Sequence, residues 1–451
     1  MTHRPKYDLL IHNGTAVTVN KAFDILGNAL VCIRDGRIAS IGETDPAKKL
    51  PEADTVIDAH GGIIMPGLVN THTHVPMSLF RGLADDLPLS IWLNDHIFPA
   101  EARHVDPEFV RWATWLACTE MALGGITTCC DGYFYEEQVA DAFNRFGMRA
   151  VAGQGIIDFP APGVADPAKN IATARAFAEK ISGQPGTVTA SLFCHSPYTC
   201  SAGTLRRAKA VANELSLLFQ IHVAETESEL KQCLAEHQTS PVQYLDRTGV
   251  LDDRTLLVHA VWVGDEDIEL IADRGASVSH NPESNMKLGA GVAPVNRLLK
   301  AGVKVGIGTD GCASNNNLDL FREMGITAKL HKAVSGDPTV LDAQTVIRMA
   351  TIEGASAIGL DDLTGSLESG KAADLIIMDT RKPHLTPMYR PDSHIVYAAK
   401  ASDVKTVVIG GRIIVKNRDV LTMDTSEILR AAGQLGREIK TCSARISNQE
   451  G

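Results

Sequence analysis

Two histidines stand one residue apart at the end of segment 66–74, which has the sequence PGLVNTHTH. Because the side chains of an extended strand alternate between its two faces, His72 and His74 point to the same side. Two imidazoles placed in this way can share a transition metal ion. Taken alone, a His-x-His pair is more often a solvated pair at a strand end, and two ligands do not complete a tetrahedral site. A metal site therefore requires further ligands from other parts of the chain.

Two such ligands end strand-like sequences elsewhere. The sequence LFQI precedes His222, and VKVGIGT precedes Asp310. Three neutral imidazoles and one carboxylate suit Zn²⁺ or Fe²⁺ and contain too much nitrogen for Mg²⁺ or Ca²⁺. The strand-like sequence SLFC ends at His195 rather than at a lysine, so nothing is placed to bridge two metal ions. We therefore expect one divalent transition metal ion, with Zn²⁺ as the first choice and Fe²⁺ or Mn²⁺ as alternatives.

A carboxylate suited to proton transfer follows the third histidine. Glu225 lies three residues after His222, where the strand turns into the next helix. A carboxylate there lies beside the metal without having to bind it, and can move a proton from a bound water to a substrate. The alternative is an acid favoured by the helix dipole, a role that also suits Glu227 and Glu229. His259, which ends the sequence LLV, is placed to orient or polarise the water.

The elements that must position these residues are strands that alternate with amphipathic helices. Helix-length segments include 108–124, 167–181 and 202–215. Eight strand-like segments end near His74, Asp131, Gln154, His195, His222, His259, His280 and Asp310. This alternation predicts an α/β fold of the (β/α)₈ TIM-barrel type, in which the carboxyl ends of the strands meet at one mouth. An open, doubly wound sheet is the alternative, but no glycine-rich phosphate-binding motif follows a strand.

Both ends of the chain are rich in short strands. Asn13-Gly14 and Asp35-Gly36 stand between apolar segments as hairpin turns do, and Gly410-Gly411 separates two strand-like segments near the other end. We expect the two ends to form one small composite β-sandwich domain. The predicted domains are residues 1–64 and 368–451 for the sandwich, with a terminal helix in the second part, and 65–367 for a metal-dependent hydrolase barrel.

Composition narrows the class of protein. The 451 residues are 44% hydrophobic and 22% charged, which is typical of a globular enzyme. A net charge of −11 and the lack of a basic cluster argue against nucleic acid as a partner, and no apolar segment is long enough to span a membrane. The first residues contain no apolar signal segment, and the nine cysteines form no Cys-x-x-Cys pair. We therefore expect free thiols and a cytoplasmic protein.

Five motifs together resemble the amidohydrolase superfamily. They are PGLVNTHTH at 66–74, HSPYTC at 195–200, HVAET at 222–226, SHNPESNMKL at 279–288 and GTDG at 308–311. The branch that they resemble most is that of the 5-methylthioadenosine/S-adenosylhomocysteine deaminases, with triazine hydrolases as relatives. The resemblance extends over the whole chain, including both β-rich ends.

The resemblance implies roles for individual residues. As metal ligands it implies His72, His74, His222 and Asp310. As catalytic residues it implies Glu225 and His259, and we expect Asp310 to take part in proton movement as well. As substrate contacts it implies Glu101 for the ribose hydroxyls, His195, and Trp92 against the base. Without the resemblance, Glu101 would be interpreted as a surface carboxylate at a helix start and Trp92 as a core residue.

The expected activity is hydrolytic deamination of an adenine nucleoside such as 5′-methylthioadenosine, adenosine or S-adenosylhomocysteine, with release of ammonia. Glu225 would protonate the ring nitrogen next to the attacked carbon, and Asp310 and His259 would hold the attacking water in line. The first alternative is a hydrolase of another heteroaromatic amine, such as an aminotriazine, guanine or a pterin. The second is a catalytically inactive binding protein. The resemblance also suggests a homo-oligomer.

The segment after the third strand bears on the substrate's tail. In the resembling family, arginines that pair with the homocysteine carboxylate would be expected here, but residues 153–162, GQGIIDFPAP, contain none. Arg145 and Arg149 lie just before this segment and would reach in only in another register. We therefore expect 5′-methylthioadenosine or adenosine to be a better substrate than S-adenosylhomocysteine.

Overall fold

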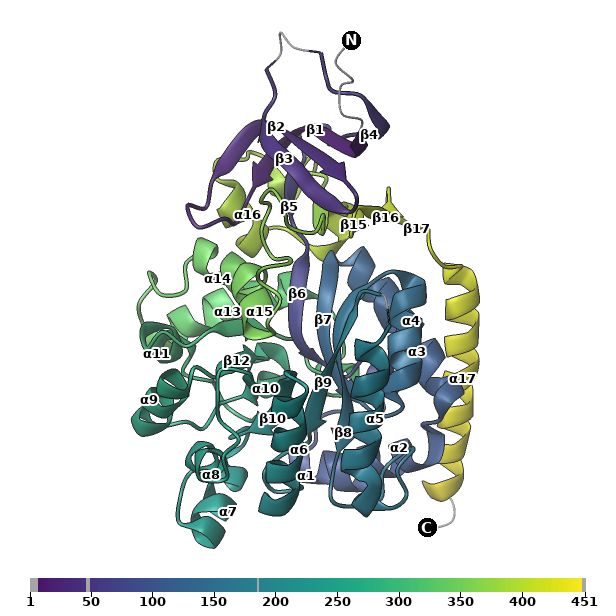
Figure 1. Cartoon of the computed structure of the whole chain (residues 1–451), viewed down its shortest axis with the longest axis vertical. Helices are drawn as coiled ribbons and strands as arrows, with labels where there is room; N and C mark the ends of the chain where they lie inside the picture. The colour runs from purple at the N-terminus through teal and green to yellow at the C-terminus, as the bar shows by residue number, and fades with distance from the viewer. Residues whose placement is uncertain (1–6, 46–48, 185, 448–451) are drawn as a thin grey trace. The chain divides into compact units, whose positions relative to one another are not determined.

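The computed structural model describes residues 7–45, 49–184 and 186–447 (Figure 1). Contacts within the chain divide it into two compact units. The first contains residues up to Asn70 together with Met121–Thr128 and Asp319–Thr422. The second contains Thr71–Glu120, Cys129–Leu318 and the residues from Met423. The boundaries predicted from the sequence, at 64/65 and 367/368, remain a proposal.

An eight-stranded parallel sheet runs in the order β13 to β6 without interruption. Its strands are β6 (Leu68–Thr73), β7 (Ile126–Tyr133), β8 (Arg149–Ile156), β9 (Val188–Cys194), β10 (Leu218–Val223), β11 (Thr255–His259), β12 (Ser277–His280) and β13 (Val305–Ile307). Just beyond β13, the backbone N–H of Asp310 donates to the carbonyl of His72 in β6 at 3.0 Å, which nearly closes the sheet. The predicted (β/α)₈ barrel is therefore confirmed.

The strands and helices of the barrel follow from the sequence pattern. Every residue of β7 and of β8 is buried, as expected for strands covered on both faces. Three helices agree with the predicted segments: α3 (Pro107–Leu123), α5 (Asn170–Ser182) and α6 (Ala202–Glu214). Helix α5 packs on β8 and β9, and α6 packs on β9 (Figure 1). Helix α6 starts where the Ser201 hydroxyl accepts from the backbone N–H of Thr204 at 3.2 Å.

The second unit contains further helices. They are η1 (Val75–Phe80), α1 (Leu89–Ile91), the π-helical η2 (Trp92–Ile97), α2 (Phe98–His104), α4 (Glu136–Phe146), η3 (Pro167–Lys169), α7 (Glu227–His237), α8 (Pro241–Arg247), α9 (Asp265–Arg274), α10 (Pro282–Lys287), α11 (Val295–Lys300), α12 (Cys312–Asn315) and the terminal α17 (Thr425–Ser447). In the part of the chain that the structure describes, no helix is both long and apolar enough to cross a membrane.

The first unit contains a nine-stranded mixed sheet built from both ends of the chain. Its strands are β1 (Tyr7–Val17), β2 (Ile25–Arg34), β3 (Arg37–Glu43), β4 (Ala53–Asp58), β5 (Ile63–Pro66), β14 (Leu375–Met378), β15 (Val404–Ile409), β16 (Arg412–Lys416) and β17 (Asp419–Val420). Its helices are α13 (Leu320–Ser335), α14 (Ala343–Met349), α15 (Ile352–Ala357), η4 (Pro383–Leu385), α16 (Pro391–Tyr397) and η5 (Ala401–Asp403). Antiparallel pairing of β5 with β14 joins the two ends, which confirms the composite β unit.

One turn predicted from the sequence is wrong. Strand β1 continues through Asn13-Gly14 to Val17, and its register with β2 shifts between His12 and Gly14. Asn13 adopts a φ of 58° and donates through Nδ2 to Asp58 Oδ1 at 2.7 Å. The Asn-Gly pair therefore forms a β-bulge, which needs the same left-handed backbone as a hairpin turn. The turn predicted at residues 35–36 is confirmed between β2 and β3.

Candidate active site

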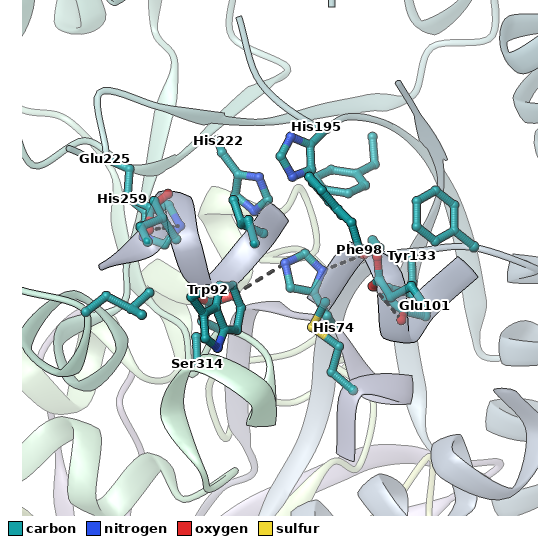
Figure 2. A pocket seen from close by; sticks show the side chains of 18 of the residues that line it. His74, Trp92, Phe98, Glu101, Tyr133, His195, His222, Glu225, His259 and Ser314 are labelled. Atoms are coloured by element: carbon teal, nitrogen blue, oxygen red, sulfur yellow. Dashed lines mark hydrogen bonds and ion pairs between the residues drawn. The ribbon is translucent and has the colours of Figure 1, made fainter. Parts of the chain in front are cut away.

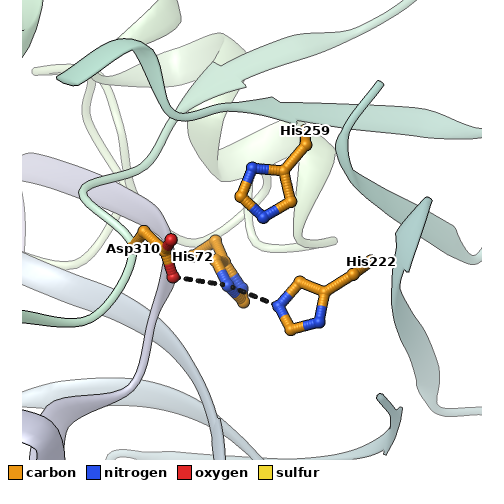
Figure 3. A group of neighbouring side chains, drawn as sticks. All are labelled: His72, His222, His259 and Asp310. Atoms are coloured by element: carbon orange, nitrogen blue, oxygen red, sulfur yellow. Dashed lines mark hydrogen bonds and ion pairs between the residues drawn. The ribbon is translucent and has the colours of Figure 1, made fainter. Parts of the chain in front are cut away.

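The carboxyl ends of four strands bring three of the predicted ligands together with His259 (Figure 3). His72 lies in β6, His222 in β10 and His259 at the end of β11, and Asp310 follows β13. Each of these four residues offers a ligand atom, and the four atoms lie within 4.8 Å of one another. The sequence-based ligand set contained His74 in place of His259. His74 lies at the same place, because its Nε2 is 3.4 Å from Asp310 Oδ1.

The separations between these atoms fit a single small metal ion. Two ligands bound at roughly 2.0–2.1 Å and at the tetrahedral angle lie about 3.3–3.4 Å apart. His72 Nε2 is 3.2 Å from His222 Nε2 and 3.4 Å from Asp310 Oδ1, and the separation of His74 Nε2 from the same oxygen is also 3.4 Å. Three nitrogens and one oxygen are also the donor set of a transition metal site. The residues present therefore fit a divalent transition metal.

The histidines are held in the tautomer and charge state that a metal ligand needs. His74 Nδ1 lies 2.6 Å from the Gly132 carbonyl, so this nitrogen donates and Nε2 keeps a free lone pair. Burial lowers the pKa of His72 to about 3 and holds the pKa of His222 well below its usual value. Both rings are therefore neutral at physiological pH, as coordination requires.

Asp310 is oriented by two serines. Its Oδ2 accepts from the hydroxyls of Ser284, at 2.6 Å, and Ser314, at 2.8 Å, which leaves Oδ1 facing the histidines. Burial raises the pKa of Asp310, but the hydrogen bond to His72 and the neighbouring histidines outweigh burial and hold it well below its usual range. Asp310 has a φ of 59°, a backbone strain typical of functional sites. The carboxylate is therefore ionised and fixed in one orientation.

Glu225 stands beside the cluster on the loop that follows β10. It is buried, and its Oε1 lies 3.8 Å from His259 Nε2. Burial raises the pKa of Glu225, and a raised pKa favours a carboxyl group that can both accept and give a proton. His259 Nδ1 lies 2.8 Å from Asn285 Oδ1, which fixes the ring so that Nε2 faces Glu225.

His74, His222, Glu225, His259 and Asp310 line a cavity, called the inner cavity here, whose empty space is about 640 Å³ when the part open to solvent is included (Figure 2). Trp92, Phe98, Glu101, Tyr133 and His195 line its walls. The indole Nε1 of Trp92 is buried and has no hydrogen-bond partner among the described residues. A buried donor without a partner is unusual and is suited to a polar ligand atom.

Glu101 is buried in this wall rather than exposed at a helix start. Its side chain lies on α2, is 3% exposed and accepts from the Tyr133 hydroxyl at 2.7 Å. Burial raises the pKa of Glu101 to about 7, although the hydrogen bond from Tyr133 lowers it. The interpretation as a surface carboxylate is therefore wrong, and Glu101 is available to a ligand in the cavity.

His195 lies between the cluster and the outer part of the wall (Figure 2). Its Nδ1 is 2.9 Å from the Thr199 hydroxyl, and its ring centroid is 5.1 Å from that of His222. Burial lowers the pKa of His195 to about 3, so its ring is neutral. The structure therefore brings all nine predicted site residues to one place.

Sequence reasoning missed the residues that hold these groups in place. They are Tyr133 beside Glu101, Ser284 and Ser314 on Asp310, Asn285 on His259, and Glu229 on the loop of Glu225. The motif SHNPESNMKL contains both Ser284 and Asn285, so polar residues just after β12 were a usable signal. The sequence indicates for Glu229 only the role of an acid at a helix start. Its hydrogen bonds are to the backbone N–H groups of Ala224 and Glu225, so no partner side chain identifies them in the sequence.

The whole chain is similar to known hydrolases. It matches the Amidohydrolase family over residues 63–414. It is 45% identical to the 5-methylthioadenosine/S-adenosylhomocysteine deaminase of Syntrophobacter fumaroxidans, over 96% of this chain and 98% of that protein. It is 45% identical to the 5′-deoxyadenosine deaminase of Methanothermobacter thermautotrophicus, over 91% and 94%. An adenosine deaminase from Xanthomonas campestris, crystallised with bound zinc, superposes with a TM-score of 0.94 at 38% identity and covers 97% of this chain and 99% of its own. The chain belongs to the amidohydrolase family.

Proposed function

We propose that this protein is a metal-dependent deaminase of adenine nucleosides, which releases ammonia and leaves an inosine-type product. One observation carries the proposal: a single cavity contains a metal-binding cluster with Glu225 at one end and the buried carboxylate of Glu101 in its wall. The relatives named above are deaminases of nucleosides that share adenine and ribose. Cavity and relatives therefore support the same substrate class.

The proposed ligands of one divalent metal ion are His72, His74, His222 and Asp310. When bound, a transition metal supplies a water of lowered pKa as the nucleophile. We favour Zn²⁺ because the related adenosine deaminase was solved with zinc, and Fe²⁺ or Mn²⁺ suit the same donors.

Glu225 is proposed to move the first proton. Its raised pKa and its place beside His259 suit a carboxylate that takes a proton from the attacking water and gives it to the ring nitrogen next to the amine-bearing carbon. Protonation there prevents negative charge from building up on the ring as the carbon becomes tetrahedral. General acid–base catalysis of this kind contributes on the order of 10²- to 10⁴-fold.

His259 and Asp310 are proposed to position the attacking water and complete the proton transfer. Asn285 fixes the ring of His259, and Ser284 and Ser314 fix the carboxylate of Asp310. Asp310 then passes the second proton of the water towards the amine, which leaves as ammonia. Because both groups are held by hydrogen bonds, little reorganisation is needed as the reaction proceeds.

The nucleoside is proposed to bind through Glu101, Trp92 and His195. A carboxylate has two oxygens and can accept from both ribose hydroxyls. Trp92 lines the same cavity and offers a ring face for the base, and His195 offers a neutral imidazole. An aminotriazine or a pterin has no ribose, so the buried carboxylate of Glu101 would accept from the Tyr133 hydroxyl but from no hydroxyl of the substrate.

We further propose a cytoplasmic enzyme that acts on small molecules as a homo-oligomer, without nucleic acid or a membrane as partner. The eight cysteines whose side chains the structure describes, out of nine in the sequence, are free and buried, which suits a reducing compartment.

An ammonia-release assay of the metal-loaded enzyme tests the proposal. The substrates are adenosine, 5′-methylthioadenosine, guanine, a pterin and an aminotriazine, and the control is the Glu225→Gln variant. We expect the two adenine nucleosides to be deaminated and the others to react at least about a hundredfold more slowly. Activity on a ribose-free substrate alone would contradict the proposal.

A further inference from the structure

A second cavity adjoins the inner cavity. It is called the outer cavity here, and its empty space is about 1140 Å³ when the part open to solvent is included. Its lining includes Asn94 on η2, Phe159 after β8, and Ser228 and Gln232 on α7. Leu89, Leu93, Phe98 and Tyr198 line both cavities. The two cavities therefore adjoin each other along these four residues.

The placement of the proposed substrate determines which part of it reaches the outer cavity. The amine-bearing carbon must lie at the metal-binding cluster, and the ribose hydroxyls must lie at Glu101. Phe98 lies three residues before Glu101 on the same helix, α2, and its ring faces Phe159 at 5.4 Å between centroids. The 5′ carbon is the one end of a nucleoside that neither anchor holds. Phe98 lines both cavities, so we place the 5′ carbon beside Phe98, on the side of the outer cavity.

The charged side chains that line the two cavities have one sign. Glu101, Glu225 and Asp310 line the inner cavity and Glu229 lines the outer one, and no lysine or arginine is among the described residues that line either. The other lining residues of the outer cavity are uncharged, and include amides, hydroxyls and aromatic rings. An anionic group placed there would lose water without gaining a cation as partner.

We propose that the outer cavity binds the 5′ substituent of the nucleoside, and that it accepts neutral or cationic substituents and rejects anionic ones. This inference rests on the proposed function, because it places the nucleoside by its reaction. Phe98, Phe159 and Tyr198 suit an apolar thioether, and Glu229 with the carbonyl and hydroxyl oxygens near it suits an ammonium group. A phosphate, or the carboxylate of an amino acid tail, faces only acids and neutral groups.

Substrates that differ only in the 5′ group test the proposal. We would measure kcat/KM of the metal-loaded enzyme for 5′-methylthioadenosine, 5′-amino-5′-deoxyadenosine, adenosine 5′-monophosphate and S-adenosylhomocysteine. We expect the neutral and cationic substrates to lie within about tenfold of each other, and the two carrying an anionic group to be at least about a hundredfold poorer. An anionic substrate within about threefold of 5′-methylthioadenosine would overturn the assignment.

A charge introduced into the outer cavity gives an independent test. Asn94 is exposed, and its side chain bonds only the Ser90 carbonyl one turn earlier, at 2.9 Å, so substitution should leave the fold intact. We expect Asn94→Arg to raise kcat/KM for adenosine 5′-monophosphate at least about tenfold, with 5′-methylthioadenosine changed less than threefold. Asn94→Met is the matched control of similar length without charge, and it should leave the ratio unchanged.

The two proposals fail in different ways. If Asn94→Arg and Asn94→Met change the ratio of the two substrates equally, the outer cavity does not bind the 5′ group. That result would leave deamination of adenosine untouched. If the wild-type enzyme deaminates no nucleoside at all, the proposed function itself is wrong, and the placement of the 5′ group is wrong with it.

Discussion

Glu229 accepts a hydrogen bond from the backbone N–H of Glu225, with 2.8 Å between Oε2 and the nitrogen. Its other oxygen accepts from the N–H of Ala224 at 2.9 Å, and Ala224 has a φ of 50°. A single buried carboxylate thus holds two successive N–H groups of the loop in a strained conformation. This contact fixes the backbone position of Glu225 and therefore the position of its side chain, so Glu229 acts as a positioning residue.

We expect Glu229→Gln to lower kcat by about tenfold to a hundredfold with little change in KM, because an amide has one acceptor oxygen and turns its NH₂ towards the second N–H. Small displacements of a catalytic group cost this much. Glu227→Gln, an exposed acid on the same helix, is the control and should behave as wild type. Equal effects of the two variants on kcat would show that the contact does not position Glu225.

Replacement of Glu225 itself separates proton transfer from metal binding. Glu225→Gln keeps the shape of the side chain but cannot carry a proton, so we expect the folded protein to keep its metal and lose on the order of 10²- to 10⁴-fold in kcat. Metal analysis and steady-state kinetics of the same preparation measure both quantities. A variant with turnover within about threefold of wild type would refute the assigned role.

Metal removal should abolish activity without unfolding the protein. His72 Nε2 lies within 3.4 Å of two other ligand atoms, His222 Nε2 and Asp310 Oδ1. We therefore expect His72→Ala to lose metal and activity together. Chelator treatment of the wild type should also remove metal and activity, and added Zn²⁺, Mn²⁺ or Fe²⁺ should restore the activity. The control is Thr73→Val, which replaces a hydroxyl by a methyl group at the position between His72 and His74. This variant should keep the metal. Activity that survives complete metal removal would exclude a metallohydrolase.

The ligand cluster could be predicted because its members lie at or just after the ends of three strands, β6, β10 and β13. Apolar sequences before His222 and Asp310 identify buried strands, and the alternation at His72 and His74 follows from strand geometry alone. In a barrel these strand ends meet at one mouth. The positions of the ligand side chains themselves could therefore be inferred without knowing how the helices pack.

The residues that hold the site in place could not be found in this way. The hydrogen bond of Tyr133 to Glu101 depends on where a π-helical segment places α2, and no periodic pattern predicts that position. The bulge at Asn13 shows the same limit, because an Asn-Gly pair specifies left-handed backbone but not whether the strand ends there. Contacts that depend on tertiary packing could thus not be predicted from local sequence patterns.

The pKa of Glu101 predicts how substrate binding depends on pH. Burial raises this pKa to about 7 from the model-peptide value of 4.5, so the carboxylate is ionised above pH 7 and gains a proton below it. Only the ionised form can accept from both ribose hydroxyls. We therefore expect KM for adenosine to rise as pH falls through 7. The folded protein holds this proton more tightly than the unfolded chain. The contribution of Glu101 to the free energy of unfolding is therefore present below pH 4.5 and is lost as the pH rises from 4.5 to 7.

Two variants test this assignment together. Tyr133→Phe removes the hydrogen bond that lowers the pKa of Glu101, so the pH at which KM changes should move upwards. Glu101→Gln removes the titration, so KM should be raised at all pH values, while the melting temperature at pH 8 should be equal to or above that of wild type because a buried charge is gone. A KM profile that keeps its inflection near pH 7 in Glu101→Gln would show that another group is responsible.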